Sequence, residues 1–282
     1  MKKTKIIVFV CMVLSFTSCR KEEVPMGGID GKFSVSELRK VYFSKGNLQY
    51  QAATRTWRFA EQQYELIGES NANISETYDG WIDLFAWSSS GCVSGGHICQ
   101  PWSVSLTSSD YYPLGVHNNN LSLKNGADWG CNAISNGENK KYYWYTLSFE
   151  EWLYLLNERE NAAQKRGFGT VAGIRGFILL PDEWKQPAGL LFNTESTNYY
   201  DNVYSVKEWP IMEAAGAVFL PAAGWREVYS VEQIDRVGSY WTSSCYKANQ
   251  AFNFVFSPSA FLVDNTNLRG AGFSVRLARE AD

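Results

Sequence analysis

The sequence is poor in the residues that metal sites and hydrolytic chemistry need. It contains two histidines, His97 and His117, and no Cys-x-x-Cys pair, so the spacing typical of a zinc site is missing. No Gly-x-Ser-x-Gly motif is present, and His97 lies in a glycine-rich loop, where an isolated histidine is a weak candidate for a general base. We therefore expect no metal site, no cofactor and no catalytic residue.

Positive charge and long apolar runs are also scarce. The formal net charge is −3, and no lysine–arginine cluster occurs beyond the N-terminal region. Because nucleic-acid binding needs a basic stripe to meet the phosphates, we expect no nucleic-acid partner. The apolar run at 6–14 is about half of the ~20 residues that a membrane-spanning helix needs.

This short apolar run belongs to a predicted secretory signal. Lysines at positions 2, 3 and 5 precede the run, and small residues lead from it to Cys19. A charged start, a short apolar core and a small-residue cleavage site make up a signal peptide, which we place at residues 1–18.

Cys19 stands where bacterial lipoproteins carry their acylated cysteine. Acylation would anchor the protein to the membrane, since each buried methylene contributes ~0.8 kcal/mol. Residues 19–32 are then a lipidated tether, and its Lys21-Glu22-Glu23 resembles the export signal of surface lipoproteins in Bacteroidetes-type bacteria. We predict an outer-membrane lipoprotein at the cell surface. The alternatives are a soluble secreted protein cleaved nearby and a charged segment that serves only as a solvated tether.

Four cysteines follow the signal region: Cys92, Cys99, Cys131 and Cys245. An even number in an oxidising compartment permits disulfides, and four cysteines allow three pairings. Cys92 and Cys99 flank two glycines that would let a loop close on itself, so we predict a Cys92–Cys99 disulfide. Cys131 and Cys245 are then isolated buried thiols.

The pattern of apolar residues predicts short strands and two helices. Ser148 and Glu151 form a capping box that opens a helix extending to about residue 163, and Ser205 with Glu208 opens a second one through about residue 215. The predicted strands are 40–43, 47–51, 56–60, 174–180, 217–220, 240–242, 251–256 and 273–278, with 47–51 and 56–60 forming a hairpin. A long polar stretch, 88–141, separates the first strands from the first helix. Strands, then helices, then strands again indicate an α+β protein.

Aromatic residues are abundant, at 15% of the chain with 11 Trp and 16 Tyr. Such rings suit recognition surfaces and carbohydrate stacking as well as protein cores. Composition therefore favours a binding protein, although most of these rings are expected inside the core.

Several segments together resemble one known family. They are Val41-Tyr42-Phe43-Ser44, Gly46-Asn47-Leu48, Trp57-Arg58-Phe59-Ala60, Trp129-Gly130, 132–137, 179–184, 219–226, Tyr240-Trp241-Thr242-Ser243-Ser244 and 272–277. This series resembles the C-type-lectin-like domain of Bacteroides-type surface lipoproteins over nearly all of 33–279. That family is related in fold to the formylglycine-generating-enzyme/sulfatase-modifying proteins and to variable proteins diversified by retroelements. The resemblance implies a C-type-lectin-like domain at 33–282, with short mixed and antiparallel sheets, two main helices and long loops.

The resemblance also implies a binding face at 245–270, between two strands of the core sheet. Along this stretch, framework positions Ala251, Phe254 and Phe256 alternate with polar positions, as expected of a half-buried strand. The residues expected on display are Tyr246, Lys247, Asn249, Gln250, Asn253, Asp264, Asn265, Asn267 and Arg269. This mixture of aromatic, amide and charged groups suits recognition of an extracellular protein or glycan. The alternative is an ordinary polar rim on a structural sheet.

Departures from related families limit the chemistry. Formylglycine-generating chemistry, as the resemblance implies, needs two closely spaced cysteines in the C-terminal part, whereas only Cys245 follows Cys131 here. The Glu-Pro-Asn and Trp-Asn-Asp signatures of calcium-dependent lectins are absent, and the oxygen-bearing residues at 264–267 are too sparse for calcium. We predict a non-enzymatic protein. It either binds a protein or glycan through 245–270 or serves as a structural or assembly component of the envelope.

Overall fold

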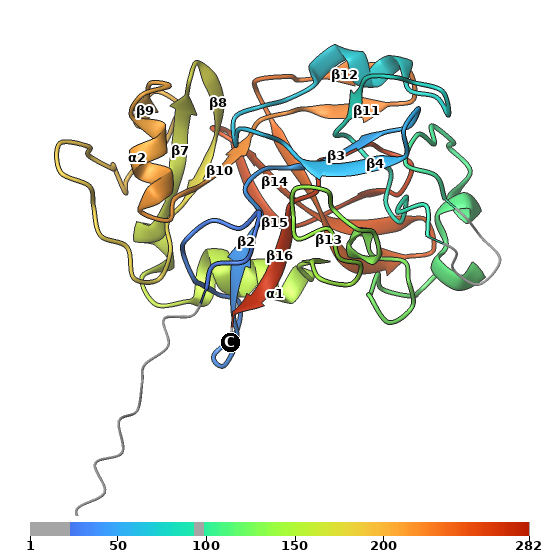
Figure 1. Cartoon of the computed structure of the whole chain (residues 1–282), viewed down its shortest axis with the longest axis horizontal. Coiled ribbons are helices and arrows are strands. Elements are labelled where there is room, and N and C mark those ends of the chain that lie inside the picture. Colours follow the sequence, from blue (N-terminus) through green and yellow to red (C-terminus); the bar gives the residue numbers. More distant parts are fainter. Residues whose placement is uncertain (1–22, 93–98, 282) are drawn as a thin grey trace, which may run out of the picture.

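A computed structural model describes residues 23–92 and 99–281 of the chain (Figure 1). The predicted signal peptide and Cys19 lie outside these residues. The architecture is α+β, with several short sheets and few helices, as predicted. No helix in the described part of the chain has the length and apolar composition to cross a bilayer.

A four-stranded antiparallel sheet joins the two ends of the described chain. Its strands are, in spatial order, β1 (Phe33–Ser34), β2 (Lys40–Phe43), β16 (Leu277–Ala281) and β6 (Tyr145–Thr146). The C-terminal strand is therefore an interior strand, with β2 on one side and β6 on the other.

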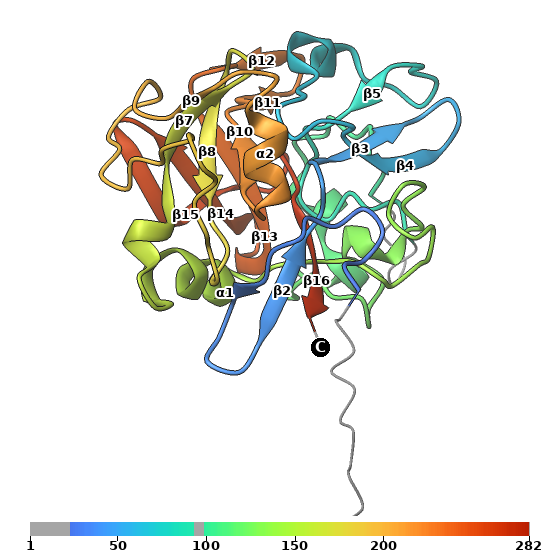
Figure 2. The ribbon, with the colours of Figure 1, turned by 60° about the vertical axis from the view of Figure 1, so that its left-hand side comes forward.

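A second four-stranded sheet lies on the left of Figure 1, where it packs against a helix. Its strands are, in order, β10 (Val218–Pro221), β8 (Ile174–Leu179), β7 (Arg166–Val171) and β9 (Val203–Tyr204), with β9 parallel to β7. The helix α2 (Trp209–Ala214) lies beside this sheet in Figure 2. Its Trp209 and Met212 are buried in one cluster with Ile178 and Phe219 of the sheet.

Smaller sheets lie on the other side of the molecule. They are β4 (Thr56–Phe59) with β3 (Leu48–Gln51) and β5 (Trp81–Ile82), and the pair β11 (Trp225–Glu227) and β12 (Ser230–Glu232). The predicted hairpin is confirmed, because β3 pairs with β4 in antiparallel register from Leu48–Phe59 to Gln51–Thr56.

The sheet that carries the predicted binding face is an antiparallel meander of β13 (Gly238–Lys247), β14 (Gln250–Ser257) and β15 (Ala260–Leu268). Phe254 and Phe256 enter one large hydrophobic cluster, whereas Ala251 and Trp241 enter another. Part of this sheet is therefore covered on both faces. The predicted strand 273–278 is only partly regular, since Phe273 and Ser274 form isolated bridges and β16 begins at Leu277.

The capping box at the first helix is confirmed. Ser148 Oγ accepts from the Glu151 amide, and the Glu151 carboxylate accepts from the Ser148 amide. The helix α1 (Phe149–Leu153) is shorter than predicted, because it continues as one π turn (Tyr154–Glu158) and stops at Arg159. The backbone at Arg159 is no longer helical, and its buried guanidinium donates to Asp182 and to the Leu180 carbonyl.

The second capping pair forms without starting the helix. Ser205 and Glu208 exchange the two side-chain bonds to backbone amides, but regular helix begins at Trp209. Elsewhere the described chain forms short 3₁₀ helices at Gly68–Asn73, Ser108–Tyr111, Pro113–Gly115, Trp129–Cys131 and Ala162–Lys165.

The buried side chains group into two large clusters and smaller ones. Leu147, Trp152, Leu155 and Leu156 are buried together, as the apolar face of the helix predicts. Residues ahead of the predicted domain boundary also pack. Pro25 is buried, Ile29 is 3% exposed, and the Ile29 amide donates to the Phe43 carbonyl at 2.9 Å. The compact part of the described chain thus begins before residue 33.

Candidate functional site

The turn between β13 and β14 displays a small group of side chains. Tyr246 is 44% exposed, and Lys247 and Asn249 are exposed as predicted. The Tyr246 ring meets Phe252 edge-to-face with centroids 5.1 Å apart, and Lys247 Nζ lies 4.7 Å from the Tyr246 centroid. Phe252 in turn stacks on Phe149 of α1 at 4.5 Å. We call Phe149, Tyr246, Lys247 and Phe252 the tip cluster.

The tip cluster has a firm base at the start of α1. The Phe149 amide, one of the free donors at the helix N-terminus, donates to Ser244 Oγ of β13 at 3.0 Å. Ser244 Oγ also lies 3.5 Å from Glu150 Oε2. On the other side of β13, the Cys245 amide donates to Asn120 Oδ1 at 2.9 Å. The strand that carries Tyr246 is therefore held by α1 and by the long polar stretch.

Arg269 does not belong to a displayed face, and this prediction is wrong. Its side chain is fully buried, with the guanidinium 4.5 Å from the Trp87 ring centroid. It donates to the carbonyls of Tyr111, His117 and Lys247. Burial lowers the pKa of Arg269 to about 10. Arg269 fastens the long polar stretch to the hairpin end, a role that depends on partners far away in sequence.

Asn253 is also buried rather than displayed. It pairs with Trp241 across β13 and accepts a hydrogen bond from Asn265 Nδ2 at 3.0 Å. The prediction that Asn253 is displayed is wrong, because this part of the sheet is covered on both faces. Residues on either face of β14 are therefore buried here. Asn253 Nδ2 has no hydrogen-bond partner within the described residues.

The remaining predicted residues are divided between the two faces of the sheet, and Gln250, which pairs with Lys247, shares the face of the tip cluster. Gln250, Asn265 and Asn267 are partly exposed, and Asp264 is exposed. Asn267 pairs with Ala251, whereas Phe252 pairs with Thr266. Since paired residues share a face and successive residues alternate, Asn265 and Asn267 lie on the face opposite Phe252.

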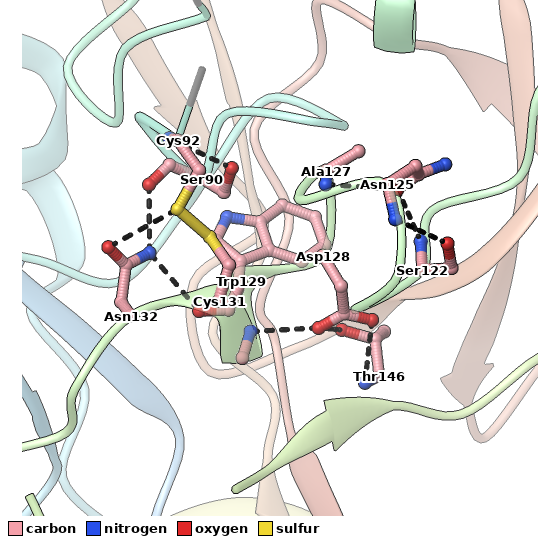
Figure 3. Close-up of a disulfide and its surroundings, with 11 residues drawn as sticks. Ser90, Cys92, Ser122, Asn125, Ala127, Asp128, Trp129, Cys131, Asn132 and Thr146 are labelled. Carbon is pink, nitrogen blue, oxygen red and sulfur yellow. Dashed lines mark hydrogen bonds between the residues drawn. A yellow bond between two sulfur atoms is a disulfide. The ribbon is translucent and has the colours of Figure 1, made fainter. Parts of the chain in front are cut away.

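The predicted Cys92–Cys99 disulfide is wrong: Cys92 is bonded to Cys131 (Figure 3). The 3₁₀ turn at Trp129–Cys131 presents Cys131 to Cys92, and Asn132 Nδ2 beside it donates to the Ser90 carbonyl at 2.9 Å. Cys99 is a free buried thiol packed with Tyr111, and burial raises its pKa. Cys245 is free and partly buried.

A groove of about 850 Å³ begins beside the tip cluster and shares Glu150 with its base. Its lining includes Tyr142, Tyr143, Tyr145 and Tyr154. A salt-bridge network forms part of the lining, in which Arg39 contacts Glu151 at 2.6 Å and Glu280 at 2.7 Å.

The floor of the groove contains the buried carboxyl of Asp128. It accepts from the Gly130 amide at 2.8 Å and the Thr146 amide at 3.0 Å, and burial raises its pKa to about 6. The aromatic run 142–145 was the available sequence signal for this groove, but the opposing residues come from distant segments.

The described residues contain no group of three or more His, Cys, Asp or Glu side chains placed to hold a metal ion. Comparisons with protein-family models, curated proteins and solved structures give no match for this chain. The functional argument therefore rests on the residues and their geometry.

Proposed function

We propose that the protein is a lipid-anchored extracellular binding protein with a C-type-lectin-like domain that holds its ligand through the tip cluster. The observation that carries this proposal is the exposed Tyr246, backed by Phe252 and Phe149 and accompanied by Lys247. Rigid, partly polar aromatic anchors next to a cation are typical of binding hot spots. On this proposal the protein is not an enzyme.

Of the two ligand classes predicted, a protein surface fits the tip cluster better than a glycan. Tyr246 presents its ring at the end of a hairpin, where it can enter a pocket of a partner. Its conformational freedom is already reduced by the edge-to-face contact with Phe252. Anchors that are ordered before binding lose less entropy on association, which favours affinity.

The disulfide supports an extracellular location. Cys92–Cys131 closes a long excursion, and disulfides of this kind persist in oxidising compartments. Together with the predicted signal peptide and Cys19, it favours an outer-membrane lipoprotein facing the outside of the cell.

The proposal is tested with a paired set of variants. Immobilised wild-type protein would enrich extracellular ligands, and affinity for each ligand would then be measured for the Tyr246→Ala/Lys247→Ala variant. We expect a loss of about 30-fold or more, which corresponds to ~2 kcal/mol at a hot spot. The matched control is Tyr229→Ala/Lys207→Ala, which removes an exposed tyrosine and an exposed lysine from other elements.

Equal ligand retention by wild type and the tip variant would reject the tip cluster as the binding site. If no ligand is enriched at all, the structural or assembly role in the envelope becomes the better account. Urea denaturation of both variants controls for folding, since exposed substitutions should change stability by only about 0.5 kcal/mol each.

A further inference from the structure

A second concavity, of about 700 Å³, lies between the β3–β4 hairpin and the segments joined by the disulfide. Tyr50 and Trp57 come from the hairpin, and Trp102 comes from the long polar stretch. The Tyr50 ring lies 4.5 Å from Trp57 and stacks on Trp102 with centroids 6.0 Å apart. Three packed rings therefore meet at one hollow, and Trp102 is the one that stays partly exposed.

The hydroxyl group of Tyr50 is open to the hollow. Most of Tyr50 is buried, at 4% exposed, but its hydroxyl oxygen is not among the buried side-chain atoms that lack a hydrogen-bond partner in the described part of the chain. Burial raises the pKa of Tyr50, while the charges of Arg55 and Glu76 act on it in opposite directions. A hydroxyl group that opens on the hollow can donate a hydrogen bond to a ligand and accept one from it.

The rim of the hollow offers hydrogen-bonding groups of both kinds. Arg55 and Lys141 can donate, Glu76 can accept, and the side-chain amide of Gln100 can do both. Arg55, Glu76 and Lys141 are exposed, so a polar ligand can exchange with the water around them. A sugar presents hydroxyl groups to such a rim and apolar C–H faces to aromatic rings.

The walls of the hollow are fixed by covalent and hydrogen bonds. Cys92–Cys131 ties the two segments that carry Ser90 and Asn132, and Asn132 Nδ2 donates to the Ser90 and Trp129 carbonyls (Figure 3). The Gly91 amide donates to the Cys99 carbonyl at 2.9 Å, which fixes the start of the segment leading to Trp102. A preformed hollow of this size is within the range of small-ligand sites.

From these observations we propose that this hollow binds a short oligosaccharide. A sugar ring packs against Trp102, the Tyr50 hydroxyl hydrogen-bonds one sugar hydroxyl, and the rim groups bind the others. The site is separate from the tip cluster and does not depend on the function proposed for it.

The test uses the full chain in detergent and a panel of four probes: maltotriose, cellotriose, chitotriose and trigalacturonate. Binding would be measured by titration calorimetry, and we expect at least one probe to bind with Kd of about 0.1–1 mM. Tyr50→Phe removes only the hydroxyl and should weaken that probe about five-fold without changing thermal stability. Trp102→Ala should weaken it about ten-fold or more. Tyr246→Ala is the control and should leave binding unchanged.

Two results would overturn the proposal. One is the absence of binding by all four probes up to ~10 mM. The other is binding that survives both Tyr50→Phe and Trp102→Ala, or that is lost in Tyr246→Ala, because the sugar would then occupy a different surface. Since Tyr50→Phe leaves every described hydrogen bond in place, a failure to fold does not confuse its interpretation.

Discussion

Arg269 gives the sharpest test of how the tip cluster is supported. Main-chain carbonyls of Tyr111, His117 and Lys247 accept from its buried guanidinium, and the Gln250 carbonyl accepts from Nε at the longer distance of 3.5 Å. At roughly 1.5 kcal/mol for each bond to a charged donor, the three shorter bonds are worth about 4.5 kcal/mol. Water that enters the vacated space offsets roughly 1 kcal/mol of this. We therefore expect Arg269→Ala to lower the free energy of unfolding by about 3.5 kcal/mol.

Arg269→Lys separates charge from geometry. A lysine keeps the positive charge but lacks the planar fork that reaches several carbonyls while stacking on Trp87. We expect it to lose about half as much stability as Arg269→Ala. Urea denaturation measures both variants. Hydrogen exchange should show lost protection at 111–117 and 247–250 before the rest of the chain.

The contrary result is equally clear. If Arg269→Ala changes stability by less than about 0.5 kcal/mol while abolishing ligand binding, Arg269 acts as a ligand contact. The assignment of Arg269 as the link between the long polar stretch and the hairpin would then be wrong.

Three further predictions concern charge, covalent bonds and anchoring. Burial raises the pKa of Asp83 to about 6, so the folded state binds the Asp83 proton more tightly than the unfolded state, and this carboxyl lowers stability as pH rises from about 4 to about 6. The urea midpoint of Asp83→Asn should therefore rise relative to that of wild type across this pH window. A difference between the two midpoints that stays constant with pH would contradict the prediction. Replacing Cys92 and Cys131 with serine should cost about 4 kcal/mol for a cross-link spanning 39 residues, with a non-reducing peptide map showing the Cys92–Cys131 peptide in wild type only. Cys19→Ser should release the protein from the membrane fraction, and unchanged membrane partition would reject lipidation.

Local patterns predicted much of the fold because their causes lie close together in sequence. The Ser148–Glu151 capping box, the β3–β4 hairpin and the burial of Trp152 each depend on a few neighbouring residues or on one apolar face. Ala251, Phe254 and Phe256 are buried, as their framework positions predict.

The failures share one physical cause, which is that the deciding partner is distant in the chain. The sequence pattern predicts that Arg269 and Asn253 are exposed polar residues. In the structure the long polar stretch and a second hydrophobic cluster cover them. The pairing of Cys92 depended on the turn at Trp129–Cys131 rather than on the nearer Cys99. The hollow beside Tyr50 could not be predicted, because its lining combines the β3–β4 hairpin with the distant segment that carries Trp102.

The position of β16 has a consequence for how the protein is made. Residues 277–281 fill the gap between β2 and β6, so this sheet cannot close until these residues have been synthesised. The pairing of β16 with β2 joins residues of very high sequence separation, and such contacts slow folding. We expect this sheet to stay open while the intervening residues are being made. A variant truncated after residue 276 would leave one edge of β2 and one edge of β6 unpaired, and unpaired strand edges recruit other chains into aggregates.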